Sequence, residues 1–166
     1  MKTLRYLAYG SNLYPRRLQY RVPSARVIGT VGLTGWQLNF HKRGQDASAK
    51  CNIIQTGEIY DVVYGAVYEM LVSERNKLDK VEGLNRGYNL AQIEIVEQGT
   101  AFFYLAEEEY IDNDLLPFDW YKKLVVAGGR FHAFPKIYLA QINRVNAMPD
   151  FDDARHQHHM AILTMS

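Results

Sequence analysis

YLAYGSNL, residues 6–13, is an apolar strand pattern that ends abruptly at a Gly-Ser-Asn turn. Glycine lets the chain bend without a Cβ clash, and serine and asparagine bond readily to nearby backbone, so successive amides can converge as an anion-binding nest. Residues 13–18 then read as a helix start, with Asn12 as the predicted N-cap and Pro15 in the first turn. A helix N-terminus would add partial positive charge at the same place. The stretch predicts an anion-binding turn, and an ordinary strand-to-helix turn is the structural alternative.

Length and charge restrict the class of protein. The 166 residues predict one compact domain, and a formal net charge of +1 argues against a nucleic-acid partner. The single cysteine, Cys51, predicts a buried thiol in a reducing compartment. The apolar run Leu4–Tyr9 is too short for a membrane span or a signal sequence, so we expect a cytoplasmic protein with no membrane partner.

Hydrophobic periodicity predicts an α+β domain in which strands precede helices. A loop is expected at 41–50, and Gly128-Gly129 is interpreted as a sharp break between two helices. Residues 1–147 form the predicted domain, and residues 148–166 are interpreted as a loosely held polar tail. The expected strands are residues 4–9, 25–33, 35–40, 51–54, 58–71, 88–97 and 100–106, and the expected helices are residues 73–83, 119–126 and 135–145.

A second informative segment is LDKVEG, residues 78–83, which places Glu82 in the last turn of a short helix before Gly83. A glutamate there faces the unfavourable end of the helix dipole, and burial of Leu78 and Val81 would partly desolvate it. Both effects would help this carboxylate to accept a proton near neutral pH. A solvated surface glutamate is the structural alternative.

The two segments together resemble the gamma-glutamylcyclotransferase family, which pairs a Y-G-S-N-L loop with a later glutamate in an L-D-x-x-E-G context. The resemblance continues through Pro23-Ser24-Ala25, residues 65–68 and residues 121–123, and spans roughly residues 4–146. It implies a small mixed β-barrel with flanking helices, and a pocket in which the loop faces Glu82.

The resemblance also implies a reaction, which releases 5-oxoproline and a free amine or amino acid from a small gamma-glutamyl compound. This activity is a carbon–nitrogen lyase reaction that was formerly classed as acyl transfer. The α-amine of the substrate attacks its own γ-carbonyl carbon, so no cofactor, metal or enzyme nucleophile is expected. Glu82 would act as general base and then general acid. The substrate-binding motif would be Tyr9, Gly10, Ser11, Asn12 and Leu13, with the loop amides holding either the α-carboxylate or the developing oxyanion.

Two tyrosines are assigned to substrate binding by the same resemblance. The family places a tyrosine a few residues beyond the E-G pair, and Tyr88 matches it if one residue is deleted in this chain. Tyr121 matches a tyrosine that precedes two lysines. Amphipathic core or rim tyrosines are the structural alternative for both residues.

The same residues also suggest other functions. Ser11 as a hydrolase nucleophile conflicts with Leu13, which stands where a nucleophile elbow needs a second glycine. A metal site at His156, His158 and His159 competes with a mobile tail. A non-catalytic binding protein of the same fold, or a cyclotransferase acting on gamma-glutamyl groups attached to a larger molecule, is the alternative function. The sequence leaves the leaving amine and a homodimer open.

Overall fold

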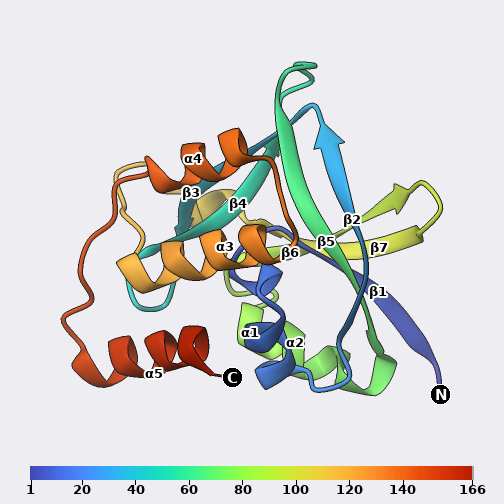
Figure 1. The fold of residues 1–166 in the computed structure, drawn as a ribbon, viewed down its shortest axis with the longest axis horizontal. Helices are drawn as coiled ribbons and strands as arrows, with labels where there is room; N and C mark the ends of the chain where they lie inside the picture. The colour runs from blue at the N-terminus through green and yellow to red at the C-terminus, as the bar shows by residue number, and fades with distance from the viewer. Residues whose placement is uncertain (166) are drawn as a thin grey trace.

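The computed structural model describes residues 1–165 and contains a mixed five-stranded sheet (Figure 1). The first strand, β1, lies in the middle of this sheet, antiparallel to β5 and parallel to β7. Its last residues, Leu7 and Ala8, are fully buried, which confirms the strand predicted before the Gly-Ser-Asn turn. The order of strands across the sheet is β2 (Arg26–Thr34), β5 (Val62–Leu71), β1 (Thr3–Ala8), β7 (Gly99–Ala106) and β6 (Tyr88–Ile95).

A second, two-stranded sheet is the hairpin of β3 (Trp36–Arg43) and β4 (Ala49–Gln55). The predicted loop at 41–50 is therefore too long, because strand pairing continues to Arg43 and resumes at Ala49. The hairpin packs against the larger sheet through β5 and β7. Among residues 1–165 no ladder of hydrogen bonds joins the two sheets, so the predicted α+β architecture is confirmed without a hydrogen-bonded closure of the barrel.

Helices cover the sheets and connect the strands. Figure 1 shows α1 and α2 next to each other below the sheet, and α3 and α4 above them. No helix in the described part of the chain combines the length and the apolar character needed to cross a bilayer. The α-helices are α1 (Pro15–Arg21), α2 (Arg75–Glu82), α3 (Asp119–Phe131), α4 (Lys136–Asn143) and α5 (Asp153–Thr164), and the 3-10 helices are η1 (Ser11–Leu13), η2 (Val72–Glu74) and η3 (Glu108–Tyr110).

The predicted N-cap of the first helix is wrong. A short 3-10 turn, η1, takes up Asn12, so α1 begins at Pro15 and Tyr14 is its N-cap. Pro15 is the first helical residue, as expected. The Asn12 side chain is thereby released from capping and is available for the contacts described below.

Gly128 and Gly129 do not break the chain but lie inside α3. A Cβ at Gly128 would stand 2.4 Å from Leu13 Cβ and 2.6 Å from the Tyr14 amide nitrogen. Gly128 therefore lets α3 approach the loop after β1 more closely than any side chain would allow, and Gly129 leaves room for Leu139, whose Cδ2 lies 2.4 Å from where a Cβ on Gly129 would stand. A Gly-Gly pair can break a helix or allow close packing between elements, and here it allows close packing.

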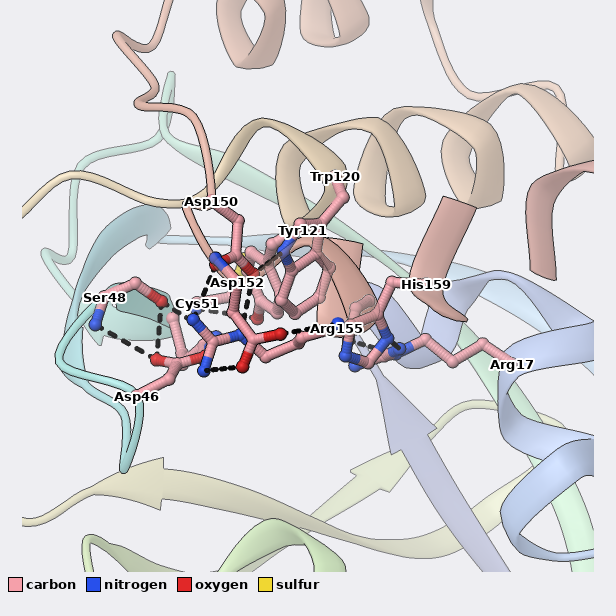
Figure 2. A network of polar contacts seen from close by, with 12 residues as sticks. Arg17, Asp46, Ser48, Cys51, Trp120, Tyr121, Asp150, Asp152, Arg155 and His159 are labelled. Carbon is pink, nitrogen blue, oxygen red and sulfur yellow. Dashed lines mark hydrogen bonds and ion pairs between the residues drawn. The ribbon is translucent and has the colours of Figure 1, made fainter. Parts of the chain in front are cut away.

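The interpretation of the C-terminal segment as a loosely held tail is also wrong for the described residues. Asp150 has a fully buried side chain that accepts hydrogen bonds from Trp120 Nε1 (2.8 Å) and Arg155 Nε (2.6 Å), as Figure 2 shows. Asp152 caps α5 by accepting from the Arg155 amide. Paired polar groups therefore anchor a segment whose sequence lacks an apolar stripe. The division of the chain at residue 147 stays a prediction.

Candidate active site

The loop after β1 presents backbone amides without partners. Within residues 1–165 no backbone acceptor pairs with the amides of Gly10, Ser11 or Asn12, because the first residues of a helix lack intrahelical acceptors. Gly10 has φ −112°, which other residues also adopt. A Cβ on Gly10 would nevertheless stand 3.0 Å from Cys51 Cβ of β4. Glycine is needed here because two backbones meet closely, rather than because the chain bends.

Glu82 ends α2, and Gly83 caps the helix in the left-handed conformation with φ 78°. Leu78 is buried as expected, but Val81 is half exposed. The Glu82 side chain is 18% exposed, and its Oε1 accepts hydrogen bonds from Asn12 Nδ2 and Arg21 Nη1, both at 2.9 Å. Both donors fix the orientation of the carboxylate toward the loop.

Asn12 links the loop to this carboxylate. Its Nδ2 also lies 3.1 Å from the Tyr6 hydroxyl, and its Oδ1 accepts from Arg21 Nη1 at 2.9 Å. Asn12, Arg21 and Glu82 thus form a closed triangle of hydrogen bonds between the loop, α1 and α2. The arrangement fixes the position of Glu82 relative to the loop amides.

The two predicted tyrosines hold the backbone of Cys51 from both sides. Tyr88 donates its hydroxyl hydrogen to the Cys51 carbonyl at 2.7 Å, whereas the Cys51 amide donates to the Tyr121 hydroxyl at 2.9 Å. Burial raises the pKa of both tyrosines well above the ordinary value, so both hydroxyls are neutral. Because Tyr121 accepts from Cys51, it keeps its own hydrogen for another acceptor.

A small inner cavity of about 30 Å³ adjoins an outer cleft of about 430 Å³. Ser11, Glu82, Tyr88 and Tyr121 line both spaces. The inner cavity also contains Tyr9, Gly10 and Asn12, so the structure brings seven of the eight predicted site residues together.

Leu13 is the predicted site residue that the structure places elsewhere. It is fully buried, lines neither space, and its carbonyl accepts from the Tyr68 hydroxyl (2.9 Å) and from His132 Nε2 (2.7 Å). Its position indicates that Leu13 anchors the loop to the core. The motif thus contains residues that line the inner cavity and one residue that anchors the loop.

Sequence reasoning missed Arg17. This side chain is 5% exposed, donates from Nε to Ser11 Oγ at 2.9 Å and lies 3.0 Å from His159 Nδ1 through Nη1 (Figure 2). Burial lowers the pKa of Arg17 to about 9, so it stays cationic at neutral pH. Arg17 and Arg21 are four residues apart and therefore share one face of α1, a spacing that could have revealed them.

His159 of the C-terminal segment serves packing, whereas His156 Nδ1 lies 3.6 Å from Asp119 Oδ1. The His159 ring stacks on Trp120 with centroids 3.7 Å apart, and burial lowers its pKa to about 3, so it is neutral and accepts from Arg17. No group of three or more metal-ligating side chains is found between residues 1 and 165, and the hypothesis of a metal site has no support there.

Cys51 and Ser11 are potential nucleophiles at the site, but neither is activated. Cys51 is buried as predicted, and burial raises the pKa of its thiol to about 12, which keeps it protonated. The Ser11 hydroxyl accepts from the Arg17 cation and contacts no base in the described residues. The arrangement therefore offers a carboxylate, amides and hydroxyls around a small space, which suits proton transfer and oxyanion stabilisation.

Known proteins resemble this chain in sequence. Residues 62–142 match the AIG2-like family. The chain is 29% identical over 150 residues to a gamma-glutamylcyclotransferase of Homo sapiens, covering 84% of this chain and 77% of the relative. It is 28% identical over 148 residues to a gamma-glutamylcyclotransferase of Bos taurus, with the same coverage of 84% and 77%.

Solved structures show the same fold. A structure described as a gamma-glutamyl cyclotransferase superimposes with a TM-score of 0.83 at 24% identity, covering 99% of this chain and 100% of that chain. An uncharacterized protein from Homo sapiens gives 0.80 at 25% identity, covering 96% and 99%. The fold is thus the α+β fold of gamma-glutamylcyclotransferases. The chain is therefore similar to gamma-glutamylcyclotransferases in sequence and in fold.

Proposed function

We propose that this protein is a gamma-glutamyl cyclotransferase that releases 5-oxoproline and a free amine from a small gamma-glutamyl compound. One observation carries the proposal. The Glu82 carboxylate is held 2.9 Å from Asn12, in the loop whose amides have no backbone acceptor, and both residues line the same inner cavity. A base and a set of donors thus face one reacting group.

In the proposed reaction, Glu82 takes a proton from the substrate α-ammonium, and the freed amine attacks the γ-carbonyl carbon. A carbon–nitrogen bond forms and the carbonyl oxygen becomes an oxyanion. When the oxyanion collapses, Glu82 gives this proton to the leaving nitrogen and the bond from the γ-carbon to that nitrogen breaks. The ring nitrogen still carries two hydrogens, so it releases a second proton, which Glu82 passes to the released amine to give its ammonium form. The products are 5-oxoproline and the amine, so atoms and charge balance without a cofactor.

The other groups at the site would position and polarise the substrate. Loop amides of residues 10–12 would bind either the α-carboxylate or the oxyanion, and the Tyr121 hydroxyl has a hydrogen to donate. Arg17, which contacts Ser11, would add a positive charge for the α-carboxylate. Folding the glutamyl chain back into a ring-closing pose would supply a large part of the rate enhancement. The outer cleft would receive the leaving amine.

A panel of gamma-glutamyl amino acids, gamma-glutamyl amines, glutathione and a protein-attached gamma-glutamyl amine tests the proposal. We expect 5-oxoproline from at least one compound, detected by chromatography of the reaction mixture. A binding protein of the same fold would release none, although one compound would raise its melting temperature. Release from the protein-attached compound alone would indicate a larger substrate.

A further inference from the structure

The outer cleft carries more positive charge than its own carboxylates balance. Two carboxylates line it, and each is paired, Glu82 with Arg21 at 2.9 Å and Asp46 with Lys50 at 2.8 Å. Arg155, a further cation of the lining, pairs with Asp150 behind the cleft at 2.6 Å. The cations that line the cleft are Arg17, Arg21, Lys42, Lys50, Arg86 and Arg155.

Three of these cations have no ion-pair partner among the residues that the structure describes. Within residues 1–165 no carboxylate oxygen lies within 4.0 Å of the side-chain nitrogens of Arg17, Lys42 or Arg86. Arg86 is exposed, but Arg17 and Lys42 are each only 5% exposed. Burying an unpaired charge is costly unless another group compensates it, so an anion is the missing partner.

An irregularity in the pairing of β3 with β4 places Lys42 at the cleft. A register shift between Phe40 and Lys42 makes Lys42 the direct cross-strand partner of Lys50. Like charges directly opposite each other destabilise a strand pair, and Asp46 pairs with Lys50 but not with Lys42, so the charge of Lys42 is the one left to be balanced. β-Bulges of this kind re-aim side chains and are common beside active sites.

Packing fixes the Lys42 ammonium over aromatic rings. Its Nζ lies 4.3 Å from the centroid of Tyr88 and 5.8 Å from that of Tyr110. A Cβ at Gly87 would stand 2.8 Å from Nζ, so glycine leaves room for the cation. Desolvation lowers the pKa of Lys42, and the nearby Glu82 carboxylate partly opposes this effect. The ammonium is preorganised next to the proposed base.

We propose that Lys42 and Arg86 form a subsite for a leaving amine that carries two carboxylates, such as an acidic amino acid linked through its nitrogen to the gamma-glutamyl group. This assignment rests on the proposed function. Arg17, bonded to Ser11 of the loop, lies where the glutamyl carboxylate would bind, and this leaves Lys42 and Arg86 for the leaving group. Three unpaired cations then match the three carboxylates of such a dipeptide, with Lys42 as the specificity-determining residue.

The test compares gamma-Glu-Glu with gamma-Glu-Gln, which differ in one carboxylate and have nearly the same shape. We expect kcat/KM to be about tenfold higher for gamma-Glu-Glu at low salt, and the ratio to fall as ionic strength rises. Lys42→Met should reduce the ratio to about twofold or less, and Lys42→Arg should restore much of it. Lys80→Met is the matched control, since this exposed lysine lies on α2 outside the cleft and its replacement should leave the ratio unchanged.

The outcomes separate this inference from the proposed function. Equal kcat/KM values for the two dipeptides in the wild type would overturn the subsite, whatever the Lys42 variants do. If neither dipeptide yields 5-oxoproline, the proposed function fails for these compounds. The subsite is then judged by the wild-type melting temperature, which gamma-Glu-Glu should raise more than gamma-Glu-Gln, and equal shifts would refute it.

Discussion

Asn12 Nδ2 lies 2.9 Å from Glu82 Oε1, so the loop that ends the first strand holds a carboxylate 70 residues further along the chain. Arg21 donates to both side chains and closes the triangle. Asn12 therefore acts through its side chain on the proposed base, while its amide is one of the donors of the loop. Asn12 therefore belongs to both halves of the site, the proposed base and the donors of the loop.

Asn12→Ala should lower kcat by about 10- to 100-fold with a smaller effect on KM, because the base loses its orientation while substrate contacts remain. Steady-state kinetics on the best substrate of the panel measures both constants. Asn76→Ala is the matched control, since Asn76 is exposed on α2. Activity of Asn12→Ala within about twofold of the wild type would refute the positioning role.

Tyr121→Phe and Tyr88→Phe should differ in their effect on turnover. Each change leaves one buried backbone group of Cys51 unpaired and should cost about 1–3 kcal/mol of stability. Only Tyr121 has a hydroxyl hydrogen free for substrate, so we expect a larger loss of kcat/KM in Tyr121→Phe. Thermal melts combined with kinetics separate the two effects. Equal losses in both variants would assign Tyr121 a structural role.

Gly128→Ala should destabilise the protein by about 2–4 kcal/mol, because the added Cβ would stand 2.4 Å from Leu13 Cβ and 2.6 Å from the Tyr14 amide nitrogen. Denaturant unfolding measures this change. Gly32→Ala, on the exposed side of β2, places its Cβ at an ordinary contact distance of 3.4 Å and should change stability by less than about 0.5 kcal/mol. Similar values for both variants would contradict the close approach of α3 to the loop.

His159 should make stability depend on pH. Its pKa is lowered from 6.5 to about 3 by burial, so the unfolded chain binds the proton more readily than the folded chain. The stabilising contribution is complete above about pH 6.5 and is lost as pH falls towards 3. Between pH 7 and 5 the wild type should lose up to about 1 kcal/mol more than His159→Gln, allowing for solvent screening. Chemical unfolding at both pH values measures this difference, and identical losses would show that His159 titrates normally.

The strands and the paired motifs could be predicted because their information is local. Alternation of apolar residues defines β1 and β5, and the spacing of Leu78 and Glu82 defines a helix end. The features that the sequence did not predict depend on long-range contacts instead. Asn12, Gly128 and Asp150 take their roles from partners far away in the chain, namely Glu82, Leu13 and Trp120, and no local pattern contains those distances.

The burial of the cations around the cleft could not be predicted from the sequence, although the spacing of Arg17 and Arg21 places these two on one face of a helix. Lys42 reads as part of a polar loop, and only the register of β3 against β4 shows that it is buried opposite Lys50. Arg17 falls in the predicted helix start, and the structure shows that it is buried against Ser11 and His159. Net charge over the whole chain, +1, conceals this local excess of cations.

The most direct measurement is 5-oxoproline release by Glu82→Gln. Glutamine keeps the size of the side chain and an acceptor for Asn12 and Arg21 but cannot take up the ammonium proton, so a cyclotransferase that uses Glu82 as its base should lose at least about 1000-fold in kcat while substrate still raises its melting temperature. Glu74→Gln, a carboxylate outside the two cavities, controls for the substitution itself. Near wild-type release of 5-oxoproline by Glu82→Gln would contradict the account.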